Sequence, residues 1–98
     1  MPRPKIPRNI CGTAADSCFK PNRIPMSELE KVQLDKDEFE ALRLVDQMKM
    51  QQQKAAIEMG VSRQTLANIL KSARFKVVDC LSNGKALMMH SENDENIE

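Results

Sequence analysis

The feature that most constrains this chain is the segment Gly60-Val61-Ser62, which separates two stretches of helical periodicity. Glycine tolerates a positive φ and so commonly follows a helix, whereas serine commonly caps the start of one. A turn this short makes the flanking helices cross steeply, and the small side chains of Ala55 and Ala56 allow a close crossing. The sequence therefore predicts a helix, a tight turn at residues 60–62 and a second helix.

Apolar residues at helical spacing predict three helices in all. The first covers about residues 35–48, where Asp35 followed by Glu38 predicts a capping box. The second covers about residues 51–59 and the third about residues 63–81. The expected inward face of the third helix consists of Leu66, Ile69, Leu70, Ala73, Val77 and Leu81. Because no strand-like alternation stands out, we expect an all-α fold.

The two ends of the chain differ from its middle. All five prolines fall within the first 25 residues, and proline interrupts both helices and strand ladders. We therefore expect an irregular basic arm over 1–25, a helical domain over 26–90 and a disordered acidic tail over 91–98.

The formal net charge of +1 hides a segregation of charge along the chain. Residues 1–23 carry 5 basic and 1 acidic side chains, and residues 49–90 carry 7 and 2. Residues 24–48 carry 3 basic and 7 acidic ones, and residues 91–98 carry 0 and 4. Basic segments of this kind are typical of a nucleic-acid face. Three Phe with neither Trp nor Tyr offer little base stacking, which argues against a single-strand reader.

The polar face of the third predicted helix suits a helix-turn-helix, whose second helix enters the DNA major groove. Arginine pairs with guanine, and Asn or Gln with adenine. The expected base readers are Arg63, Gln64 and Asn68, and the expected phosphate contacts are Ser62, Thr65, Lys71, Arg74 and Gln52. In the arm, Arg3, Lys5 and Arg8 are expected to add backbone or minor-groove contacts. The alternative interpretation is an amphipathic helix of an ordinary bundle, with a merely solvated polar face.

The segment AAIEMGVSRQTLANILKSARFKVVDCL resembles region 4 of bacterial sigma-70 factors. More narrowly, about residues 1–90 are similar to the UPF0251 (DUF134) family of predicted DNA-binding proteins, through MPRPK, FKP, LDKDEFEALRLVD, AAIEMGVSRQT and NGKAL. The resemblance implies a winged-helix-like or sigma-region-4-like fold and a regulatory role in bacteria or archaea. Two positions depart from the pattern. Gln51-Gln52 replaces a Ser-Gln helix start, and Cys18 replaces an aromatic residue before FKP.

Other classes of function have weaker signals. The residues Cys11, Cys18, Cys80 and His90 lack the tight Cys pairs of structural zinc sites, so we expect free thiols and neither metal nor cofactor. The alternative is a zinc or iron–sulfur site on these four residues. No nucleophile–base pair or Gly-rich phosphate loop is present, which argues against an enzyme. No stretch approaches the roughly 18 apolar residues of a membrane span. The start of the chain lacks the apolar run of a signal peptide. We therefore expect a cytoplasmic protein.

Together these patterns predict a small all-α helix-turn-helix protein that binds double-stranded DNA sequence-specifically and regulates transcription. Dimerisation through the long third helix and contact with the transcription machinery are further partnerships that the sequence allows. The alternative is a protein-interaction module that docks on the transcription machinery without sequence-specific DNA binding of its own.

Overall fold

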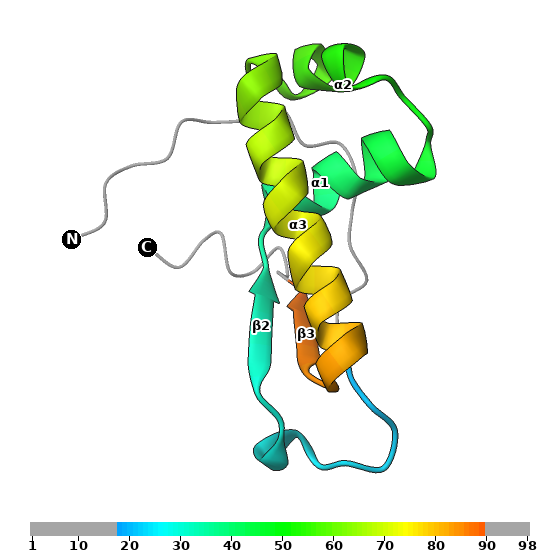
Figure 1. The fold of residues 1–98 in the computed structure, drawn as a ribbon, viewed down its shortest axis with the longest axis vertical. Coiled ribbons are helices and arrows are strands. Elements are labelled where there is room, and N and C mark those ends of the chain that lie inside the picture. The colour runs from blue at the N-terminus through cyan, green and yellow to red at the C-terminus, as the bar shows by residue number, and fades with distance from the viewer. Residues whose placement is uncertain (1–17, 90–98) are drawn as a thin grey trace, which may run out of the picture.

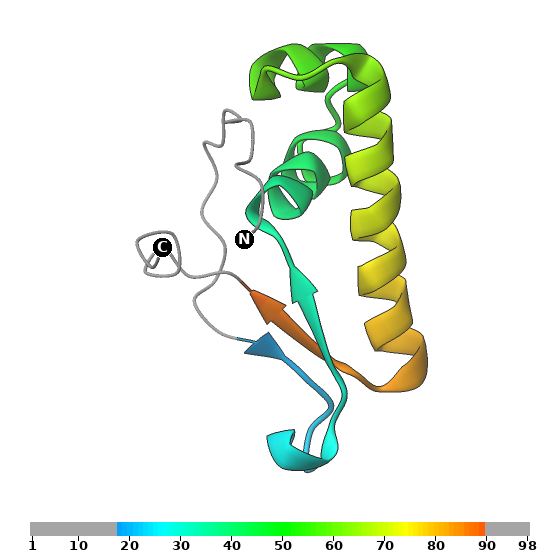
Figure 2. The ribbon, with the colours of Figure 1, turned by 90° about the vertical axis from the view of Figure 1, so that its left-hand side faces the viewer.

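A computed structural model describes residues 18–89. The helical elements are η1 (Met26–Glu28), α1 (Lys36–Ala41), η2 (Leu42–Gln47), α2 (Gln52–Met59) and α3 (Arg63–Asn83), and the strands are β1 (Cys18–Phe19), β2 (Lys31–Leu34) and β3 (Ala86–Met89). The long helix α3 lies along one side of the molecule, with α1 and the strands on its other side (Figures 1 and 2). Helix α2 lies across the N-terminal end of α3 in both views.

The three helices predicted from periodicity are confirmed, with ends within two residues of those expected. The first is an α-helix, α1, that continues without a break into the π-helical segment η2. The five-residue spacing typical of a π-helix is seen where the Met48 N–H donates to the carbonyl of Arg43 at 2.9 Å. Its predicted capping box also forms, with the Asp35 N–H donating to Glu38 Oε1 at 2.8 Å. These signals are local, since cap and partner lie three residues apart.

The prediction of an all-α fold is wrong, because the described residues also contain a three-stranded sheet. Its strand order is β1-β3-β2, so the last strand in the sequence is the central one. Strand β3 pairs antiparallel with β1, where Leu87 lies opposite Phe19, and parallel with β2, where Leu87 lies opposite Val32. The parallel pair needs a long crossover, and residues 35–85, with all three α-helices, provide it.

The sheet also includes residues of the expected N-terminal arm. Strand β1 lies within the segment expected to be an irregular arm, and its pairing with β3 joins it to the domain. Strands of two and four residues are too short for alternation to be distinctive, and their partners are far apart in the sequence. The expected tail over 91–98 lies outside the described residues, as does most of the expected arm.

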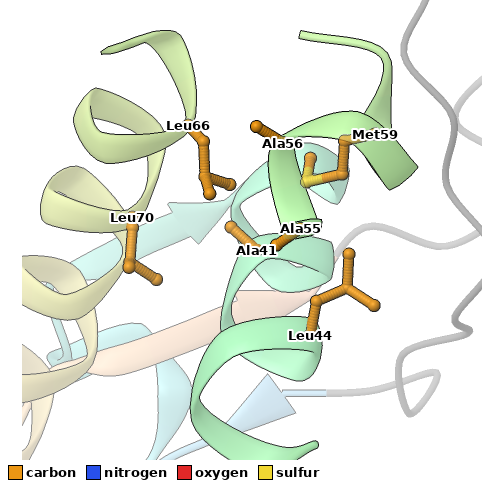
Figure 3. Close-up of a cluster of buried hydrophobic side chains, with 7 residues drawn as sticks. All are labelled: Ala41, Leu44, Ala55, Ala56, Met59, Leu66 and Leu70. Carbon is orange, nitrogen blue, oxygen red and sulfur yellow. The ribbon is translucent and has the colours of Figure 1, made fainter. Parts of the chain in front are cut away.

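The hydrophobic core lies where α1, η2, α2 and α3 meet (Figure 3). Its buried members are Ala41, Leu44, Ala55, Ala56, Met59, Leu66 and Leu70. At the crossing of α2 and α3, the small Ala55 and Ala56 share this cluster with Leu66 and Leu70 of α3. A wider crossing would leave a void there, and voids in cores are costly.

The predicted inward face of α3 is correct only in its N-terminal half. Leu66, Leu70 and Ala73 are buried, but Leu81 is 80% exposed. Each step of four residues advances about 40° around an α-helix with about 3.6 residues per turn. The steps from Ala73 through Val77 to Leu81 therefore rotate out of the buried side.

A polar cluster ties α1 to α3 and β2. The carboxylate of Glu38, which is 6% exposed, accepts from Lys76 Nζ at 2.7 Å and from the Ser72 hydroxyl. Lys76 Nζ also donates to the carbonyl of Gln33 at 2.6 Å. Burial opposes ionisation of Glu38, but these hydrogen bonds and that from the Asp35 N–H outweigh it and lower its pKa. Lys76 therefore serves the fold, a role that the sequence pattern did not indicate.

Within residues 18–89, none of the helices combines the length and the apolar composition that crossing a bilayer would require.

Candidate nucleic-acid interface

The turn between α2 and α3 has the geometry that its sequence predicts. Gly60 adopts the left-handed conformation, with φ 71° and ψ 32°. Its N–H donates to the carbonyl of Ile57 at 3.1 Å, and the Val61 N–H donates to the carbonyl of Ala56 at 3.0 Å. These bonds satisfy carbonyls at the end of α2, and the chain changes direction within three residues. The turn thereby sets where the first residues of α3 point.

Ser62 is the N-cap of α3, as predicted. Its Oγ accepts from the Thr65 N–H at 3.0 Å, and its hydroxyl donates to Thr65 Oγ1 at 2.9 Å. The cap satisfies one of the free N–H groups of the first turn. By contrast, Gln51 makes no side-chain cap bond to α2, in line with the departure from the family pattern at Gln51-Gln52. Gln52 is partly buried at the first residue of α2.

The side chains expected to read bases are exposed on α3. Arg63, Gln64 and Asn68 are all exposed, and so is Lys71. The buried Leu66 and the core beneath it fix this orientation. Gln64, Asn68 and Lys71 therefore lie on the side of α3 away from the core, as the sequence pattern predicts. Arg63 is exposed because it is the first residue of α3, although its spacing places it on the same side as Leu66 and Leu70.

Gln64 and Asn68 form a pair one helical turn apart. Gln64 Nε2 donates to Asn68 Oδ1 at 3.2 Å. Because each carboxamide carries both a donor and an acceptor, this bond leaves the Asn68 amino group and the Gln64 carbonyl oxygen for other partners. The pair thus presents a donor and an acceptor together, which is the pattern that an adenine edge requires.

Two cations of the expected set have no ion pair among residues 18–89, namely Arg63 and Lys71. Arg74 differs, because its guanidinium donates two hydrogen bonds to the Asp46 carboxylate, from Nη2 to Oδ1 at 2.7 Å and from Nε to Oδ2 at 3.1 Å. The hydrogen bond from Arg74 lowers the pKa of Asp46. Both side chains stay about half exposed, so the pair is open to water and weakly stabilising. The structure therefore gives Arg74 a partner within the chain and does not leave it free for phosphate.

Asp46 of η2 is a partner of α3 that the sequence pattern did not indicate. It lies 28 positions from Arg74, and no local pattern links the two. Phe75 and Val78 were missed as well, although both are exposed on α3. Their spacing from Lys71 by four and seven residues was the signal that could have placed them on the same side of α3 as Lys71.

Several predicted site residues lie outside the described residues, namely Arg3, Lys5 and Arg8. The same holds for Cys11 and His90. Within residues 18–89 no cluster of three metal-ligating side chains occurs. Cys18 and Cys80 are free there, and burial raises the pKa of the Cys80 thiol.

The described fold and face define a small domain of three α-helices with a three-stranded sheet, in which a capped helix presents a polar side to solvent. The chain belongs to the family described as protein of unknown function DUF134, whose model matches residues 1–96. A UPF0251 protein of Aeromonas salmonicida is 70% identical over 95 residues, which cover 97% of this chain and 93% of that protein.

Further relatives carry the same description. A UPF0251 protein of Vibrio cholerae is 60% identical over 91 residues, with 93% of each chain covered. One from Shewanella sediminis is 50% identical over 95 residues, covering 97% of this chain and 99% of that protein. No solved structure matches the chain.

Proposed function

We propose that this protein binds double-stranded DNA sequence-specifically and acts as a cytoplasmic regulator of transcription. In this proposal α2, the turn at 60–62 and α3 work as a helix-turn-helix of the sigma-70 region 4 kind, with α3 as the recognition helix. The observation that carries the proposal is the exposed polar side of α3, held outward by the core that α3 shares with α2.

Base reading is assigned to the first two turns of α3, since recognition helices use their N-terminal residues. Arg63 suits guanine, whose O6 and N7 accept a bidentate pair. The hydrogen-bonded pair of Gln64 and Asn68 suits adenine, because the mutual bond holds both carboxamides in place before DNA arrives. Such preorganisation reduces the side-chain entropy lost on binding.

Positioning on the phosphates is assigned to Ser62, Thr65 and Lys71. The two hydroxyls keep acceptor and donor capacity near the start of α3, where the helix dipole favours an anion. Arg74 joins this set only by exchanging Asp46 for a phosphate, so we expect a smaller contribution from it than from Lys71. Between Gly60 and Val78 the chain has no acidic residue, so α3 repels no phosphate over this length.

The test is selection of bound sequences from a random duplex pool, followed by binding titrations on the selected site and on a scrambled duplex. Replacing Arg63 or Asn68 by alanine should cost about 1–3 kcal/mol on the selected site and little on the scrambled one. Lys71→Ala should weaken both equally and reduce the salt slope by about one unit. Lys31→Ala, an exposed lysine on β2, is the matched control and should change neither.

The proposal fails if no motif is enriched and affinity does not depend on salt. In that case the chain is better described as a protein-interaction module that docks on the transcription machinery without reading DNA.

A further inference from the structure

The C-terminal half of α3 carries an apolar side that no described element covers. Phe75 is 68% exposed, Val78 57% and Leu81 80%. All three lie on α3, whose outer side is uncovered by described residues in both views of the fold (Figures 1 and 2). Single exposed apolar residues are ordinary, but three along one helix face mark a surface that favours contact.

This apolar side continues the polar one in a regular pattern. The exposed residues Gln64, Asn68, Lys71, Phe75, Val78 and Ser82 follow one another at steps of 4, 3, 4, 3 and 4. Alternating steps of three and four define the seam of a two-helix coiled coil. The seam is polar over the first half of α3 and apolar around Phe75 and Val78, so only its second half is suited to packing against another helix.

The charges beside the seam specify the partner. Arg74 lies on one side of the seam and Asp79 on the other, five residues further along. In a parallel pair of helices, residues five apart on opposite sides of the seam face each other across the interface. Arg74 of one chain would then face Asp79 of a second copy, and the reverse.

The intrachain partners of these two residues extend the alternation of charge. Arg74 is bonded to Asp46, and Asp79 accepts from Lys85 Nζ at 2.9 Å. Along each edge of a parallel pair, the charges would therefore alternate in sign. Asp46 and Arg74 of one chain would be followed by Asp79 and Lys85 of the other. An antiparallel pair would instead bring each flank against the same flank of the partner, so that Arg74 would face no acid on α3.

We propose that the side of α3 formed by Phe75, Val78 and Leu81 is the contact surface for a second copy of this chain, with the two helices parallel about a two-fold axis. This assembly does not require the DNA proposal. If both hold, the polar halves of the two α3 helices lie at one end of the dimer and diverge toward a single duplex, as basic regions diverge from a zipper.

The test is sedimentation equilibrium without DNA, which should show a dimer. Val78→Glu places a charge at the seam and should raise the dimer dissociation constant by at least about 30-fold, as loss of an interface anchor does. Because Val78 is exposed in the single chain, the far-ultraviolet circular dichroism spectrum of the Val78→Glu variant should match that of the wild type. Ile57→Glu is the matched control, since Ile57 is 70% exposed on α2 and should leave the dimer intact.

Orientation is tested by disulfide cross-linking of Phe75→Cys and Ser82→Cys, introduced separately. These positions lie about 10 Å apart along the helix, so only a parallel pair brings both into contact with their own copies. Efficient cross-linking of both, with none for Ile57→Cys, is the expected result. A wild-type monomer at millimolar concentration, a dimer unaffected by Val78→Glu, or cross-linking at only one position would overturn the proposal. A dimer that selects no DNA would refute only the proposed function.

Discussion

At the scale of single residues, Ser62 does two things at once. Its side chain caps α3 and also holds the Thr65 hydroxyl at the surface where phosphate is expected. The sequence predicted the cap because an N-cap bond joins residues three apart. A role in binding cannot be separated from this role in stability unless both are measured on the same variant.

Ser62→Ala should lower the free energy of unfolding by about 1 kcal/mol, within the range of about 0.5–2 kcal/mol for lost N-caps. Urea denaturation measures the change. Ser82→Ala is the control, because Ser82 is exposed on the same helix and caps nothing, so its change should stay within about 0.5 kcal/mol. Equal effects of the two substitutions would show that the cap bond contributes no stability.

Glu38 makes stability depend on pH. Its folded pKa lies below the ordinary value of 4.5, so ionised Glu38 favours the folded state above that pH. This contribution is lost as the pH falls through the folded pKa. We expect the thermal midpoint of the wild type to decrease as pH is lowered from about 5 to 3, with Glu38 supplying part of the slope.

Glu38→Gln should flatten that slope and should cost about 1–3 kcal/mol at neutral pH, since Lys76 and Ser72 no longer donate to a charged carboxylate and one of its two acceptor oxygens is lost. The measurement is the midpoint difference between wild type and variant across the pH range. Glu58→Gln, at an exposed glutamate of α2, should leave the wild-type slope unchanged. A difference that stays constant with pH would assign Glu38 a packing role only.

At the scale of elements, Gly84 ends α3 and begins the path to β3. It is left-handed, with φ 65°, and the Lys85 N–H donates to the carbonyl of Cys80 at 3.1 Å. The Asn83-Gly84 stop was predicted from sequence, because glycine adopts this conformation without steric cost. Strand β3, two residues beyond Gly84, was not predicted, because it is recognisable only through strands distant in the sequence.

Gly84→Ala should destabilise the fold by about 1–2 kcal/mol, the cost of a left-handed residue with a Cβ. Space is not the cause, because an added Cβ would lie 3.7 Å from Pro21 Cγ, an ordinary contact. Gly84→Asn should cost less, since asparagine tolerates this conformation. The measurement is urea denaturation of both variants. An equal loss of unfolding free energy in the two would point to crowding by the side chain instead of backbone strain.

At the scale of the whole molecule, a feature could be predicted from the sequence when the residues that form it are close together in the chain. Helices, caps and the exposed side of α3 arise from residues three or four positions apart. The ion pairs that join different elements do not arise from such local spacing. Arg74 and Asp46 are 28 positions apart, and Lys76 and Glu38 are 38 apart. The same limit hid the sheet, whereas Leu81 was assigned to the core because successive steps of four residues drift around the helix. Local chemistry thus predicted the α-helices and the exposed residues of α3, whereas the strands and the ion pairs between elements depend on long-range pairing.

The central place of β3 has a consequence for how the protein is made. Strands β1 and β2 are synthesised early, but the strand that lies between them is among the last residues of the described range. During synthesis both early strands lack their partner until β3 is made, and closing so long a loop is slow. A chain released before Ala86 therefore contains all the helical segments but lacks β3. Its β1 and β2 segments then have unpaired edges that can pair with other chains.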